Sequence, residues 1–184
     1  SKRARCCSLI GGLVAQGRSV IVWCIFIKSM SDLQHGLADM GIEARTINGQ
    51  DDLVCRSADL DDFRAGKFPV LITNPHTLAE SVSLHSICHD AVYYEYSFNL
   101  VHLLQSRDRI HRLGLPQDQR TRYYYLSEDY DLGKTDPWSL DEEIYTRLRE
   151  KENTMLRCID SEILETQPTS QEDLDAIFAG LFDD

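Results

Sequence analysis

The chain has 184 residues, of which 42% are hydrophobic and 27% charged, so its size and composition fit about one globular domain. Its formal net charge of −11 at pH 7 excludes a broadly basic nucleic-acid binder, and any contact with phosphates must depend on local groups. The longest apolar run, Val20 to Ile27, is far shorter than the ~20 residues of a membrane span, and the N-terminal residues are too polar for a signal peptide. The six cysteines include no Cys-x-x-Cys pair, which favours a reducing, cytoplasmic environment.

Helical and strand patterns alternate along the first two thirds of the chain. Helices are expected at residues 4–16, 31–41, 51–64 and 100–112, a short helix or loop at 78–84, and strands at 19–26, 43–47, 69–73, 91–95 and 121–126. The strand at 19–26 is apolar almost throughout, which is typical of parallel strands covered on both faces. The alternation therefore predicts an α/β domain with a mostly parallel sheet, right-handed crossovers and ligands beyond the carboxyl ends of the strands.

The last part of the chain has a different pattern. Ser139 begins a helix with three acids in its first turn, which is expected to run to about Leu164, and residues 170–182 form a shorter amphipathic helix. We therefore expect a sheet domain at residues 1–135 and a helical extension at 136–184, packed across the sheet domain or against another lobe. Many acids lie in this extension, whereas residues 107–122 are basic.

Two familiar chemical motifs are incomplete. Gly133-Lys134-Thr135 ends like a P-loop, but the required first glycine is Glu128, so this chain alone is not a complete P-loop ATPase. His85, Cys88 and His89 have the spacing of metal ligands, but no second ligand pair accompanies them, so we predict a polar turn and no metal site.

Gln105, Arg109 and Arg112 are spaced four and three residues apart, which places them on one face of the helix expected there. Arginines on one face suit a phosphate that gains charge during transfer, and they equally suit a solvated basic surface. The spacing alone does not separate these two interpretations. Tyr123 to Tyr125 could stack on bases, but a strand with alternating buried aromatics is favoured.

The segment from Gln105 to Gly114, Gln-x-x-x-Arg-x-His-Arg-x-Gly, resembles motif VI of superfamily 2 motors of the Swi/Snf type. Other segments resemble further parts of this family in the expected order: residues 19–26 (motif IV), Asn48-Gly49 with Arg56 and Phe63, residues 71–84 (motif V), residues 94–99, and residues 139–143. The resemblance covers about residues 4–160 and implies a three-layer RecA-like fold. The chain resembles the second, C-terminal lobe of such a motor, cut from a longer protein. In motif V, Ala79 and Ser81 replace two glycines, which restricts the loop backbone.

The resemblance implies roles for individual residues. Arg109 and Arg112 are expected to act as arginine fingers on the γ-phosphate, with Gln105, Glu80 and Ser83 near the nucleotide. The residues expected near DNA are Lys28, Thr73, Asn74, His76 and Arg107. ATP and Mg²⁺ are expected to be bound mainly by the missing N-terminal lobe, so this chain alone is expected to be inactive.

The expected partners are that lobe of the same protein and double-stranded DNA, contacted without sequence preference. The forms of motifs V and VI resemble motors from bacterial anti-phage gene clusters, which implies defence-system subunits as further partners. The alternative is a catalytically silent interaction module derived from a helicase lobe. An unrelated nucleotide-binding domain is disfavoured because no glycine-rich phosphate loop is present.

Overall fold

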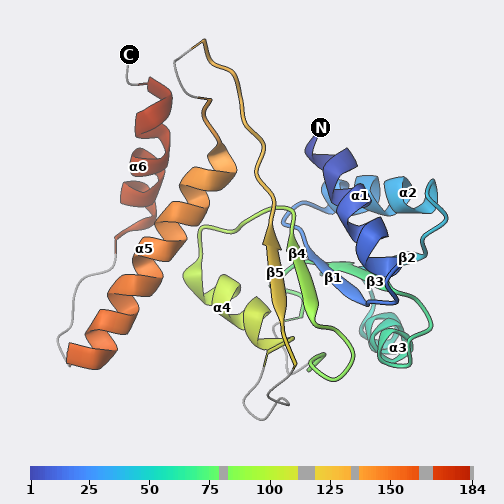
Figure 1. The fold of residues 1–184 in the computed structure, drawn as a ribbon. Coiled ribbons are helices and arrows are strands. Elements are labelled where there is room, and N and C mark those ends of the chain that lie inside the picture. The colour runs from blue at the N-terminus through green and yellow to red at the C-terminus, as the bar shows by residue number, and fades with distance from the viewer. Residues whose placement is uncertain (79–82, 112–118, 134–136, 162–167, 183–184) are drawn as a thin grey trace.

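The computed structural model describes residues 1–78, 83–111, 119–133, 137–161 and 168–182, and Figure 1 shows their arrangement. Five strands form one wholly parallel sheet in the order β2-β3-β1-β4-β5. The strands are β1 (Val20–Trp23), β2 (Ala44–Ile47), β3 (Val70–Thr73), β4 (Asp90–Tyr93) and β5 (Arg122–Tyr125). The helices are α1 (Lys2–Val14), α2 (Ile27–Ala38), α3 (Leu53–Arg64), α4 (Leu100–Asp108), α5 (Leu140–Ser161) and α6 (Ser170–Phe182). The predicted parallel α/β fold is confirmed.

Each face of the sheet has its own hydrophobic core, because side chains alternate along a strand. On one face, Val20 and Val22 pack with α1 and α2 through residues such as Ile10 and Leu33. On the other, Ile21 and Trp23 pack with residues of α3, α4 and α5. All four residues of β1 are buried, which explains the continuous apolar pattern of this strand.

Two helix ends differ from the sequence prediction for tertiary reasons. Helix α2 begins at Ile27, four residues before the expected start, because the carboxylate of Glu95, which follows β4, accepts the backbone N–H groups of Ile25 and Phe26 just before the helix. Helix α4 ends at Asp108 instead of residue 112. The carbonyl groups of the next two residues accept hydrogen bonds from other segments. Leu84 N–H donates to the carbonyl of Arg109 (2.8 Å), and Thr121 Oγ1 donates to the carbonyl of Ile110 (3.4 Å).

The helical extension shares the core of the sheet domain. Ile144 and Leu148 of α5 and Ile177 of α6 belong to the same buried cluster as Trp23 and Tyr93. Figure 1 shows α5 beside α4, with α6 packed along α5. Of the two packing arrangements expected for the extension, the structure shows the one against the sheet domain. The boundary at residues 135–136 stays a prediction.

The aromatic strand β5 lies at the edge of the sheet. Tyr123 and Tyr125 pack against the core on the α4 face, while Tyr124 packs against the core on the α1 face. Tyr125 stacks on Tyr93, with ring centroids 4.7 Å apart, and contacts Tyr145 of α5 at 4.6 Å. These tyrosines therefore stabilise the fold as alternating, partly buried aromatics. None of the helices in the described residues has the length and apolarity to cross a bilayer.

Candidate functional site

The residues predicted to lie near DNA lie mainly where β1 and β3 end. These strands are neighbours, with Trp23 opposite Thr73, so the segments that follow them adjoin at one edge of the sheet. Lys28 lies in the first turn of α2, with its side chain 85% exposed and its ammonium group 3.1 Å from Asp32. Thr73 is fully buried and donates its hydroxyl to the carbonyl of Ile47 at 2.8 Å, so its side chain offers no surface to a ligand.

The segment after β3 forms a tight turn. Asn74 Oδ1 accepts hydrogen bonds from the backbone N–H (2.8 Å) and the hydroxyl (2.7 Å) of Thr77. The exposed His76 lies within this turn, and its ring meets the ring of His102 of α4 edge to face, with the centroids 3.9 Å apart. Nδ1 of His102 is 3.2 Å from Ser97 Oγ. The turn is thereby attached to the beginning of α4.

The free energy of unfolding is expected to depend on pH through His102. Burial, and secondarily the nearby His76, lower the pKa of His102 below 6.5. Because the folded state favours the neutral ring, the contribution of this ring to stability is present above pH 6.5 and is lost as the pH falls through 6.5 toward the folded pKa. We expect His102→Gln to flatten the decrease in unfolding free energy between pH 7.5 and 5.5, measured by urea denaturation. The same substitution at the exposed His35 of α2 serves as control, and an equal flattening in both variants would contradict the assignment.

Glu95, directly after β4, is a site residue that the sequence analysis missed. Its Oε2 accepts the backbone N–H groups of Ile25 (2.9 Å) and Phe26 (3.0 Å), and its Oε1 accepts the hydroxyl of Ser29. One carboxylate therefore joins the end of β4 to the beginning of α2, and fixes the segment that carries Lys28. The signal was present: Glu95 opens the segment in which the resembled family has an acidic residue before Trp-Asn.

Replacing Glu95 by alanine is expected to lower the free energy of unfolding by about 2 kcal/mol, because hydrogen bonds to a charged group contribute roughly 1.5–3 kcal/mol. The change leaves two backbone donors at the start of α2 without their acceptor. Urea denaturation measures the loss, and Glu43→Ala, at a largely exposed carboxylate beside Arg45, is the control. Equal stability of the two variants would show that Glu95 does not cap α2.

Exposed apolar side chains surround the same edge of the sheet. These side chains lie in the segments that follow β1, β2 and β4, and their exposed fractions range from 40% to 73%. They are Phe26, Ile27, Leu53, Val54, Phe98 and Val101. Exposed apolar side chains gathered at one edge of a domain favour a docking surface there.

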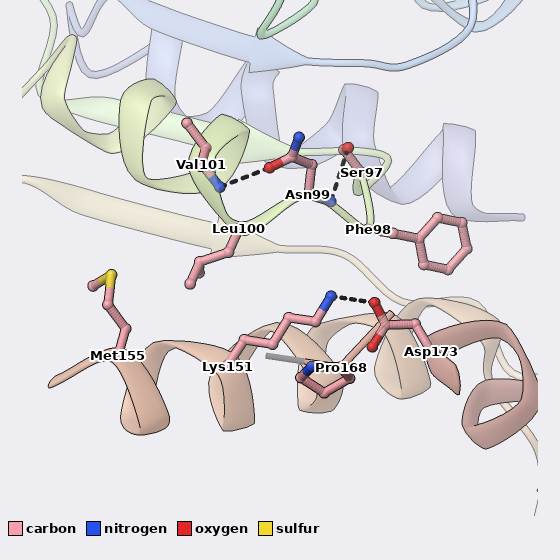
Figure 2. A pocket seen from close by; sticks show the side chains of 9 residues that line it. All are labelled: Ser97, Phe98, Asn99, Leu100, Val101, Lys151, Met155, Pro168 and Asp173. Atoms are coloured by element: carbon pink, nitrogen blue, oxygen red, sulfur yellow. Dashed lines mark hydrogen bonds and ion pairs between the residues drawn. The ribbon is translucent and has the colours of Figure 1, made fainter. Parts of the chain in front are cut away.

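A hollow of about 450 Å³ lies beside this edge, between the start of α4 and the two last helices. Figure 2 shows the side chains that line it. Leu100 and Met155 line it together with the ion pair of Lys151 and Asp173. None of the residues predicted for ATP or DNA lines this hollow, but Phe98 and Val101 of the exposed apolar side chains do.

A second group of predicted residues lies near the other end of α4. Arg109 is the half-buried C-cap of α4, and Gln105 lies one helical turn before it. The backbone bond from Leu84 to Arg109 joins this helix end to the segment that begins after β3. Ser83, next to Leu84, hydrogen-bonds His85 through its hydroxyl. Ser83 is therefore the residue next to the backbone bond at the end of α4. Glu80 and Arg112 lie outside the described residues.

Arg107 has an internal role. Its Nη1 is 2.7 Å from Glu152 of α5, and its Nε donates to the hydroxyl of Tyr125 at 3.1 Å. Its side chain is only 20% exposed. The guanidinium thus links α4, β5 and α5, and its charge is already paired, which does not fit the predicted contact with DNA.

The Cys88 region is part of the core. The thiol of Cys88 is buried and donates to the carbonyl of Ser19 at 3.4 Å, and burial raises its pKa to about 12. Such a thiol is not a ready source of the thiolate that zinc requires.

The five-stranded parallel sheet with helices on both faces is a RecA-like α/β fold. The C-terminal part of the Fun30 ATPase domain shares it with a TM-score of 0.64 and 19% identity, over 80% of this chain and 44% of that one. Dbp5 of S. cerevisiae, bound to RNA and ADP BeF3, gives a TM-score of 0.65 and 19% identity, over 81% and 35%. The Pyrococcus furiosus Hef helicase domain gives 0.53 and 21%, over 67% and 25%. The chain thus spans less than half of each of these structures.

Sequence comparison identifies the family. Residues 1–114 match the helicase conserved C-terminal domain, which is more than half of the chain. The chain belongs to the helicase C-terminal domain family. No curated protein sequence matches it.

Proposed function

We propose that this chain is the second motor lobe of an ATP-dependent DNA helicase or translocase of the Swi/Snf type. One observation carries the proposal. The segment after β3 begins among the predicted nucleic-acid contacts and reaches the end of α4, where Leu84 bonds to Arg109 at 2.8 Å. A single segment therefore connects the edge that carries Lys28 and Asn74 with the helix end at Arg109, one of the predicted arginine fingers, as a motor that couples hydrolysis to movement requires.

The proposed ATP site is divided between two lobes. The described residues of this chain offer an arginine-bearing helix end and no glycine-rich loop, which fits a lobe that completes a nucleotide site held mainly elsewhere. ATP with Mg²⁺, bound mainly on the N-terminal lobe, supplies the phosphoryl group for transfer to water. Arg109 and Arg112 contact the γ-phosphate only when the lobes close, so binding favours closure, and loss of the γ-phosphate favours opening.

At the carboxyl edge, Lys28, Asn74 and His76 contact the DNA backbone, which positions a motor without reading the base sequence. The exposed apolar side chains at this edge supply part of the surface for the N-terminal lobe. The forms of motifs V and VI support placement among bacterial defence motors, with subunits of such a system as partners and a cytoplasmic location. A silent interaction module would use the same apolar surface, and activity separates the two proposals.

The test is ATP-driven displacement of a third strand from a DNA triplex by the complete protein that carries this lobe. We expect displacement with ATP and not with ADP, on double-stranded DNA of unrelated sequences. ATP turnover that neither DNA nor RNA stimulates, with no displacement, would favour the interaction module. Stimulation by RNA alone would overturn the assignment to DNA.

A further inference from the structure

A small basic cavity of about 240 Å³ lies where β1, β4 and β5 begin. This is the opposite end of the sheet from Lys28 and Asn74, because the strands are parallel and those residues follow strand ends. The cavity is lined by the segments that precede the three strands, with Arg18, His89, Asp90, Arg120 and Arg122 among the lining residues.

The cavity is also separate from Arg109, the predicted arginine finger that the structure describes. Tyr124 packs on the α1 face of the sheet, and Arg122, two residues earlier, lies on the same side by the alternation of a strand. Thr121, between Arg120 and Arg122, points the other way and donates to the carbonyl of Ile110, just after α4. The two exposed arginines and the end of α4 therefore belong to different faces of β5.

The charge of the cavity is positive in a chain with a net charge of −11. Arg18 and Asp90 form an ion pair of 2.8 Å, and Asp90 Oδ1 also accepts the hydroxyl of Tyr124 at 3.2 Å. Asp90 is 1% exposed, so both of its oxygens are already used within the fold. Three arginines against one aspartate leave two positive charges in excess among the lining side chains.

The ion pair with Asp90 gives Arg18 a structural role, whereas no ion pair among the described residues gives one to Arg120 or Arg122. Both are exposed, and neither forms an ion pair with any residue that the structure describes. His89 adds a further polar group, because its Nδ1 is buried and has no hydrogen-bond partner among the described residues. Burial lowers the pKa of His89 below 6.5, so its ring is neutral at pH 7 and one nitrogen can carry a donor hydrogen.

We propose that this cavity binds a phosphate group, held by Arg120 and Arg122, with His89 among the residues that line it. Guanidinium groups match phosphate oxygens with two parallel hydrogen bonds, and a cavity of this size is far too small for a folded partner. The phosphate belongs either to a nucleic-acid backbone or to a free phosphate compound. The proposal stands apart from the motor function, since none of the residues proposed for ATP or DNA lines the cavity.

The test compares the complete protein with the Arg120→Ala/Arg122→Ala and Arg3→Ala/Arg5→Ala variants. The control removes two exposed arginines of α1, at the other end of the sheet, and so changes the net charge equally. We expect inorganic phosphate to raise the Tm of the wild type and the control saturably above sodium chloride of equal ionic strength. In the cavity variant the affinity for phosphate is expected to fall about tenfold or more. The single variant Arg120→Gln repeats the comparison with a smaller change.

A labelled DNA duplex identifies the source of the phosphate. If the cavity holds a nucleic-acid backbone, the slope of log affinity against log salt becomes shallower by about 0.9 in the cavity variant relative to the control, as expected for one lost phosphate contact. An unchanged slope, with phosphate binding lost, assigns the cavity to a free phosphate compound. The proposal is overturned if phosphate acts like chloride on the wild type, or if the cavity variant responds to phosphate as the control does.

Discussion

Replacing Arg112 by alanine is expected to lower DNA-stimulated ATP hydrolysis by the complete protein by roughly 10³- to 10⁵-fold, the effect of an arginine finger in characterised NTPases. Arg109→Ala is expected to act in the same direction. Both guanidinium groups are proposed to meet the γ-phosphate only in the closed state, so the loss appears in turnover. Binding of ATP, measured with a fluorescent analogue, is expected to remain close to that of the wild type.

A matched control is Arg64→Ala in α3, which removes an arginine whose side chain is 41% exposed and whose only partner among the described residues is Asp61. This variant is expected to hydrolyse ATP at the wild-type rate. Unchanged turnover in Arg112→Ala and Arg109→Ala, with DNA stimulation intact, would remove the proposed fingers. The chain would then fit an interaction module better than a motor lobe.

The second large effect concerns the attachment of α6. Asp173 is 3% exposed, and its carboxylate contacts Nε of Arg147 at 3.0 Å and Nζ of Lys151, both on α5. Removing one member of a buried ion pair costs about 3–5 kcal/mol, because the remaining charge stays buried without a partner. Arg147 is 26% exposed and can reach water, so we expect Asp173→Ala to cost about 3 kcal/mol, at the lower end of that range.

The loss is expected to be local, because Ile177 is the buried anchor of α6 in the shared core and the sheet itself is untouched. A change of about 3 kcal/mol corresponds to roughly a hundredfold faster hydrogen exchange of the α6 amides, with the exchange of β1 and β3 unchanged. Asp175→Ala, at an exposed acid of the same helix, is the control. Faster exchange in both variants alike would show that the buried ion pair does not hold α6.

The sheet could be predicted from the sequence because its strands are short and covered on both faces. The continuous apolar runs of β1 and β3 require burial on two sides, and only a parallel sheet between helices provides it. Gly17 and Gly41 follow the helices expected near residues 4–16 and 31–41, and both have positive φ values of 74° and 73°, where other residues are strained.

The parts that could not be predicted depend on residues distant in the chain. Glu95 accepts the backbone N–H of Phe26 at the start of α2, although the two residues are 69 positions apart in the chain. No local pattern near Ile27 indicates an early helix start. Arg107 lies in a basic segment that suits DNA, but its partner is Glu152, 45 residues later. Spacing also placed Gln105, Arg109 and Arg112 on one helix face, whereas α4 ends at Asp108 because neighbouring segments bond the following carbonyls.

The most direct test of the proposed split motor is the distance between the two lobes during the ATP cycle. Cys55 of α3 is an exposed cysteine for one dye, and a second dye on the N-terminal lobe reports the distance by energy transfer. With DNA present, we expect a non-hydrolysable ATP analogue to increase energy transfer, ADP to leave it low, and Arg112→Ala to abolish the increase. Energy transfer that is the same with the analogue, with ADP and without nucleotide would contradict a second motor lobe.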